Sequence, residues 1–199
     1  MVSIYTPGGG GGGGDNSWAR HRRVSATANL YTAGSDSGQG TGGTTAITAN
    51  RLYAVPLYLA KSFDADAFQF YVATAVAFSA RVGLYRDTAL YPAALEIDIG
   101  TVSVGTTGYK LVTFTQRTLT AGVYWLALVS DGGPTLGEIQ NLDGTLNAFL
   151  GSPASSATNN WGWDGAHTYA ALPDPFPAAA TLTNTGNRRA PWFMLRLVA

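Results

Sequence analysis

Short apolar runs with a two-residue period dominate the chain from residue 51 onward. In AFQFYV, Phe68, Phe70 and Val72 fall on one face, and in RVGLYR, Val82 and Leu84 do the same. Such alternation is typical of strands half-buried in a sheet, and no run has the apolar spacing of a helix of several turns. Seven runs show the strand pattern: 51–60, 67–75, 80–87, 95–104, 109–116, 122–130 and 191–199. Their number and spacing predict an all-β fold, an antiparallel jelly-roll-like β-sandwich.

The run GVYWLALV is apolar on both of its faces. Trp125 and Val129 alternate with Tyr124 and Leu128. A strand of this kind is covered on both sides, so we expect a loop or another subunit over its second face. In the first run, Pro56 has no N–H for a ladder, which predicts an edge strand or a bulge there.

The chain before residue 51 has a different composition. Seven consecutive glycines, Gly8–Gly14, predict a slim connector or a segment packed against neighbouring chains, because glycine loses the most conformational freedom when ordered. We therefore divide the chain into an extended N-terminal anchoring arm (1–24), a Gly/Ser/Thr-rich connector (25–50) and a sandwich (51–199) with long loops over 131–190. The arm is either a solvated basic linker or an assembly anchor, with these candidate residues: Trp18, Arg20, Arg22 and Arg23.

Charge and cysteine usage exclude several classes of protein. Charged residues make up 12% of the 199 residues and the net charge is zero, so we expect no nucleic-acid partner. Ten of the twelve basic residues are arginine, which suits contacts within an assembly, and a weakly charged surface favours a homo-oligomer. The lack of cysteine removes disulfides and thiolate metal sites. The first residues lack the pattern of a secretory leader, and no run predicts membrane insertion.

The loop-like stretch NNWGWDGAHTY suggests a binding site. Sugar recognition pairs aromatic faces with amides and carboxylates, and this stretch supplies both kinds of group. The candidate glycan-binding residues are Asn159, Asn160, Trp161, Trp163, Asp164, His167 and Tyr169. The alternative is that both tryptophans are buried as loop anchors or at a subunit contact.

Patterns that would indicate catalysis are weak. The chain has two histidines, His21 and His167, and neither a Gly-x-Ser-x-Gly elbow nor a His-Glu-x-x-His helix. Asp64 and Asp66 could pair as catalytic carboxylates or ligate calcium, but aspartates at a turn before a strand are usually solvated. We expect no enzyme activity, no catalytic residue, no metal site and no cofactor.

The run from residue 51 to residue 131 resembles a domain found in tail-fibre, tail-tip and related structural proteins of tailed bacteriophages. The segments that carry the resemblance are NRLYAVPL at 50–57, ARVGLYRDTALYPAALEIDIGTVSV at 80–104, TTGYKLVTF at 106–114 and LTAGVYWLALVSDG at 119–132. Similar jelly-roll modules occur in bacterial secreted proteins. The polyglycine tract is also similar to glycine tracts of phage fibres and adhesins.

The resemblance implies a virion structural protein, most simply a tail-fibre or tail-tip component in host attachment. The arm would attach it to other virion proteins after assembly in the host cytoplasm, and the sandwich would face host glycans. Phage fibres are usually trimers, which makes a trimer the expected homo-oligomer. Two alternatives remain open, a capsid decoration or head-spike protein and a bacterial carbohydrate-binding module.

Overall fold

The structure, a computed structural model, describes residues 30–33, 43–140, 160–184 and 189–198. These residues form strands, turns and bends and contain no helix, so none of them lies in a helix that could cross a membrane. The strands are β1 (Leu30–Ala33), β2 (Thr44–Ala46), β3 (Arg51–Leu59), β4 (Phe63–Thr74), β5 (Ser79–Thr88), β6 (Tyr91–Ser103), β7 (Gly108–Leu119), β8 (Gly122–Ser130), β9 (Thr135–Gln140), β10 (Asn160–Ala166), β11 (Thr181–Asn184), β12 (Arg189–Pro191) and β13 (Phe193–Leu197).

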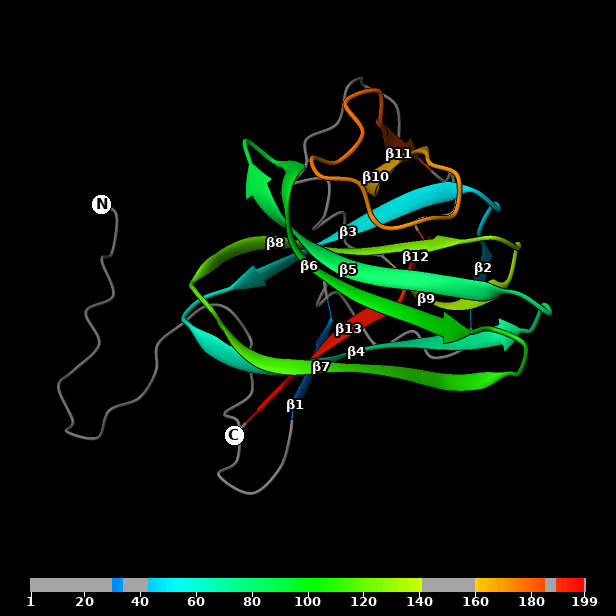
Figure 1. Cartoon of the computed structure of the whole chain (residues 1–199), viewed down its shortest axis with the longest axis horizontal. Coiled ribbons are helices and arrows are strands. Elements are labelled where there is room, and N and C mark those ends of the chain that lie inside the picture. Colours follow the sequence, from blue (N-terminus) through cyan, green and yellow to red (C-terminus); the bar gives the residue numbers. More distant parts are fainter. Residues whose placement is uncertain (1–29, 34–42, 141–159, 185–188, 199) are drawn as a thin grey trace, which may run out of the picture.

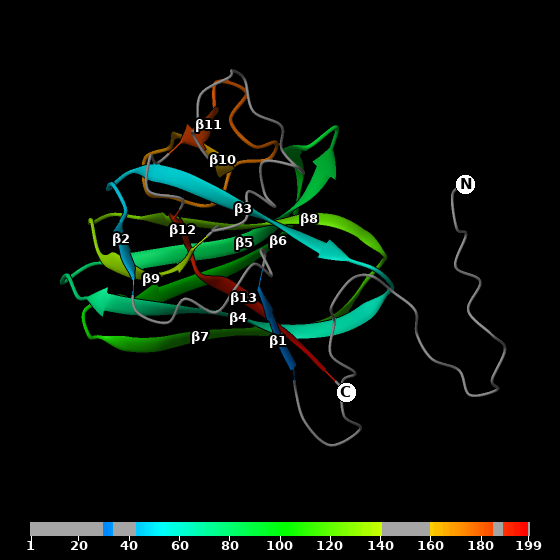
Figure 2. The ribbon, with the colours of Figure 1, turned by 180° about the vertical axis from the view of Figure 1, so that it is seen from behind.

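Two antiparallel sheets face one another (Figure 1). The upper sheet of Figure 1 has the order β11-β10-β3-β8-β5-β6. The lower sheet has the order β1-β13-β4-β9-β12, with β7 beside β4 and β2 beside β9. Seen from behind, the same two layers lie one above the other, with β3 in the upper layer and β4 in the lower one (Figure 2). The predicted all-β, jelly-roll-like sandwich is confirmed.

The core between the sheets follows the predicted alternation. Phe68, Phe70 and Val72 of β4 are buried there and meet Val82 and Leu84 of β5 in one cluster. Burial of such side chains contributes about 1.5–3 kcal/mol each to folding. The seven runs with the strand pattern correspond to β3 to β8 and β13, with shifted ends.

The stretch 131–190 differs from the prediction of long loops. It contains β9, β10, β11 and part of β12. Strand β10 has the sequence NWGWDGA, which is poor in strand-forming residues, and it is held by antiparallel pairing with β3 and β11. Its Gly162 meets the backbone of β3 so closely that a Cβ there would lie 2.0 Å from the Ala54 carbonyl oxygen. Residues 141–159 and 185–188 of this stretch lie outside the described residues.

Two further segments bear on the predicted division of the chain. The anchoring arm, 1–24, lies outside the described residues, whereas β1 and β2 from the predicted connector join the lower sheet.

Pro56 lies in β3 beyond the residues that pair with β10, where this edge of β3 has no partner strand among the described residues. Strand β3 as a whole lies between β10 and β8, so Pro56 occupies a local gap in the pairing of an inner strand and not the predicted edge strand or bulge.

Candidate functional site

The segment 160–169 contributes strongly to packing. Trp161 is 2% exposed in the core between the sheets, where its ring stacks on Tyr53 at a centroid distance of 6.0 Å. Asp164 is buried and forms an ion pair with Arg51, and Asn160 is buried as well. These three side chains are engaged inside the fold. Asn159 and the anchor candidates Trp18, Arg20, Arg22 and Arg23 lie outside the described residues.

Trp163 lies on the other side of the upper sheet. Residues two apart in a regular strand point to the same face, but a register shift between Asn160 and Gly162 puts Trp161 and Trp163 on opposite faces. The indole Nε1–H of Trp163 donates to the carbonyl oxygen of Leu90 at 2.9 Å, and its ring meets Tyr91 edge to face at 4.7 Å. Trp163 thus ties β10 to the turn between β5 and β6.

Residues 167–180, here called the strap, cover the outer face of the upper sheet (Figure 1). Leu172 and Phe176 of the strap pack against Trp125 and Tyr85, which form a second apolar cluster. This confirms the cover that the two apolar faces of β8 predict, and a loop of the same chain provides it.

Main-chain hydrogen bonds hold both ends of the strap. The N–H of His167 donates to the Asn50 carbonyl oxygen at 3.1 Å, and the N–H of Tyr169 donates to the Asn50 side-chain oxygen at 2.8 Å. Further along, the N–H of Phe176 donates to the Ala93 carbonyl oxygen at 2.9 Å. The His167 ring lies 3.1 Å from the Ala171 carbonyl oxygen. His167 and Tyr169 are therefore only partly exposed and belong to the anchored strap.

Tyr85 links the strap to the sheet through a buried phenol. Its hydroxyl donates to the Pro173 carbonyl oxygen at 2.8 Å. Burial raises the pKa of Tyr85 far above its ordinary value, and the negative charges of Asp98 and Asp174 raise it further. The folded protein therefore holds this proton more tightly than the unfolded chain does.

We expect alkaline pH to destabilise the fold through Tyr85. Since the folded pKa lies above the unfolded value of about 10, the contribution is complete below pH 10 and is lost progressively as the pH rises beyond it. Urea midpoints at pH 7 to 12 should fall less steeply for Tyr85→Phe than for the wild type. Tyr109→Phe, which alters a phenol that is 60% exposed, is the control and should keep the wild-type slope. Parallel curves for wild type and Tyr85→Phe would contradict this assignment.

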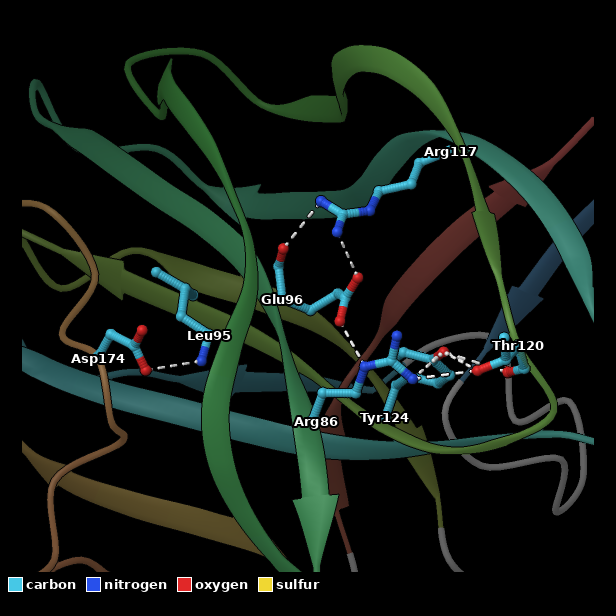
Figure 3. Close-up of polar contacts among 7 residues, drawn as sticks. All are labelled: Arg86, Leu95, Glu96, Arg117, Thr120, Tyr124 and Asp174. Carbon is cyan, nitrogen blue, oxygen red and sulfur yellow. Dashed lines mark hydrogen bonds and ion pairs between the residues drawn. The ribbon is translucent and has the colours of Figure 1, made fainter.

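A charged cluster joins the two sheets at one edge (Figure 3). The Glu96 carboxylate of β6 pairs with Arg86 of β5 and with Arg117 of β7, whose Nη2 lies 2.9 Å from Oε1. Arg86 also donates to the Tyr124 hydroxyl at 2.8 Å and lies over the Tyr124 ring. Hydrogen bonding to Glu96 raises the pKa of Arg86. Because its groups satisfy one another, we regard this cluster as structural.

The aspartates predicted at a turn lie instead within β4. Asp66 receives two hydrogen bonds from Arg196, at 2.6 and 2.7 Å, and Asp64 accepts hydrogen bonds from Gln116 and Thr118. The bulge between Ala65 and Ala67 turns this part of β4. Among the described residues, no group of three or more acidic or histidine side chains could hold a metal ion.

The outer face of the lower sheet carries a row of aromatic side chains that sequence reasoning missed. We name it the aromatic row: Tyr71 of β4, Tyr109 of β7 and Trp192 between β12 and β13. Tyr71 and Tyr109 are directly paired across the strands, with ring centroids 5.1 Å apart. Tyr109 and Trp192 lie 6.4 Å apart. Tyr109 is 60% exposed, whereas Tyr71 and Trp192 are partly buried, so Tyr109 is the ring that the row presents most openly to solvent.

The row follows from the sheet register. Because Phe70 and Val72 point into the core, Tyr71 between them points outward. Gly137 of β9 leaves space beside it, since a Cβ there would lie 3.2 Å from the Cβ of Tyr71. The sequence contains a signal for this row. In AFQFYV and in YKLVTF, a tyrosine occupies a position that the alternation assigns to the outer face of the sheet.

Comparisons with known proteins find distant structural neighbours. No family model and no curated protein matches the chain. One similar structure contains the cysteine protease and lectin-like domains of Cwp84, a surface layer associated protein of Clostridium difficile, with 12% identity and a TM-score of 0.48 over 77% of this chain and 34% of that one. A second, a clostridial Cwp84 protease after propeptide cleavage, has 13% identity and a TM-score of 0.46 over 78% and 38%. The chain spans just over a third of these proteins.

Proposed function

We propose that the chain is a virion structural protein of a tailed bacteriophage, a tail-fibre or tail-tip component that takes part in host attachment. The resemblance to phage tail proteins supports this assignment, and its segments lie in β3, β5, β6, β7 and β8 of the sandwich. The observation that carries the attachment role is the aromatic row, because exposed aromatic side chains are enriched where proteins bind partners.

In this proposal the chain acts by binding and not by catalysis. The carboxylates first considered for catalysis, Asp64 and Asp66, are hydrogen-bonded within the lower sheet, and Asp164 is paired with Arg51. The partners are other virion proteins, further copies of this chain as a homo-oligomer such as a trimer, and a host surface glycan. Nucleic acid and membrane insertion are not part of the proposal.

Two alternatives share the same fold. A capsid decoration or head-spike protein would use the arm on the head instead of the tail, and a bacterial carbohydrate-binding module would work without a particle. The arm distinguishes the virion proteins from the free module, because only the former need an attachment segment.

The test is incorporation into particles. Tagged full-length chain and a variant without residues 1–24 are supplied during infection, and purified particles are probed for the tag. We expect the full chain in particles and at least a tenfold loss for the truncated one, with unchanged circular dichroism and thermal unfolding of the purified variant. Absence of the full chain from particles would refute a virion role. Labelling of heads in electron micrographs would favour the decoration protein.

A further inference from the structure

We propose that the aromatic row, together with the amide of Gln69, binds a neutral oligosaccharide on the outer face of the lower sheet. This inference deepens the proposed function and rests on it, since it names the ligand class and the site. It places recognition on the sheet opposite to the one covered by the strap.

The rings provide apolar surface for the C–H faces of sugar rings. The interplanar angles are 70° for Tyr71 and Tyr109 and 73° for Tyr109 and Trp192, so the rings meet edge to face. No ring of the row lies flat on another, and Tyr109, at 60% exposure, keeps ring surface open to solvent. Leu111, which is 42% exposed, extends the apolar surface along β7.

The polar atoms of the row are available for hydrogen bonds. Within the described residues, the hydroxyls of Tyr71 and Tyr109 and the indole N–H of Trp192 form no hydrogen bond with the protein. Other aromatic polar atoms are used inside the fold: Tyr85 donates to Pro173, and Trp125 donates to Asp87 at 2.9 Å. Ring faces combined with unused donors and acceptors suit a ligand that has both apolar faces and hydroxyl groups.

Gln69 adds a planar amide beside the row. In the register of the sheet it lies between Leu111 of β7 and Met194 of β13. Its neighbours Phe68 and Phe70 point into the core, so Gln69 points to the same face as Tyr71. The amide forms no hydrogen bond within the described residues, and an amide can both donate to and accept from sugar hydroxyls.

Charge on this face favours a neutral ligand over an acidic one. Arg196 is paired with Asp66, and the two side chains neutralise one another. Lys110 points to the opposite face from Tyr109, and its ammonium donates to the Thr106 hydroxyl at 2.6 Å. An acidic glycan would require an unpaired cation beside the rings.

The experiment uses the purified full-length chain on an array of neutral oligosaccharides of hexose and N-acetylhexosamine units, with acidic polysaccharides included. Hits are titrated by NMR while following the Trp192 indole N–H, which is assigned with Trp192→Phe. We expect binding of a neutral oligosaccharide, a shift of this signal, and affinity losses of at least tenfold for Tyr109→Ala and severalfold for Gln69→Ala. Tyr58→Ala removes a tyrosine that is 53% exposed on the upper sheet, and it should change affinity less than twofold.

Three results would overturn the inference: no neutral saccharide is retained, only acidic ones are, or Tyr109→Ala binds as the wild type does. Circular dichroism and urea midpoints establish that each variant is folded. A chain that is incorporated into particles but retains no saccharide would overturn this inference alone. A chain that binds saccharide but is absent from particles would overturn the proposed function.

Discussion

Replacing Trp125 by alanine is expected to lower the free energy of unfolding by about 4 kcal/mol. The side chain is fully buried under Leu172 and Phe176 of the strap, and its Nε1–H donates to Asp87. The substitution leaves a cavity between sheet and strap and an unpaired Asp87 oxygen, and both effects act in the same direction. For a chain of this size, the melting temperature should fall by about 10 °C.

Two further variants separate packing from other causes. Trp125→Phe keeps an aromatic ring but loses the hydrogen bond and part of the volume, so about half of the loss should remain. Trp192→Ala removes a partly exposed tryptophan from the aromatic row and should cost about 1 kcal/mol or less. Equal losses for Trp125→Ala and Trp192→Ala would show that the strap does not cover β8 as described.

Replacing Glu96 by alanine is expected to lower the free energy of unfolding by about 2 kcal/mol. The side chain of Glu96 is 8% exposed between Arg86 and Arg117, so its removal leaves two guanidinium groups without a counterion. The positive charge of Arg86, which lies against the buried Tyr124 ring, is then uncompensated. We set the loss below that of a fully buried ion pair because the Arg86 and Arg117 side chains are 41% and 53% exposed. Urea unfolding of the wild type and of Glu96→Ala, at low and at high salt, measures this loss of unfolding free energy.

The matched control is Asp66→Ala. It removes one partner of the pair with Arg196 on the outer face, where the Asp66 side chain is 25% exposed, and about 1 kcal/mol or less is expected. Glu96→Gln keeps the shape and one acceptor, so it should lie between alanine and the wild type. A Glu96→Ala variant as stable as Asp66→Ala would refute the role of Glu96 in joining the sheets.

The alternation of apolar and polar residues predicts most of the fold, and where it fails the reason is physical. The phase of AFQFYV assigned Phe68, Phe70 and Val72 to the core, and the two apolar faces of β8 predicted a cover on its outer side. Strand β10 was not predicted as a strand because Gly162 and Gly165 give its sequence a low strand propensity. Its strand conformation depends on pairing with β3, which lies more than a hundred residues earlier in the chain.

The candidate site was harder to predict than the fold. Trp161 and Trp163 lie two residues apart in the sequence, yet a register shift places Trp161 in the core and Trp163 against the cluster under the strap. The aromatic row has the opposite character. Tyr71, Tyr109 and Trp192 are far apart in the sequence, and only the pairing of β4 with β7 and β13 brings them together. Local composition cannot report a site assembled by long-range strand pairing.

The most direct test of the proposed attachment role is competition for adsorption. Host cells are preincubated with the purified full-length chain, and the rate at which particles adsorb is measured by plating the free phage. If the chain contacts the host surface, the rate should fall in a saturable manner, and Tyr109→Ala should compete at least tenfold less well than the wild type. An unchanged adsorption rate at concentrations where the folded chain is in large excess would contradict a role in host attachment.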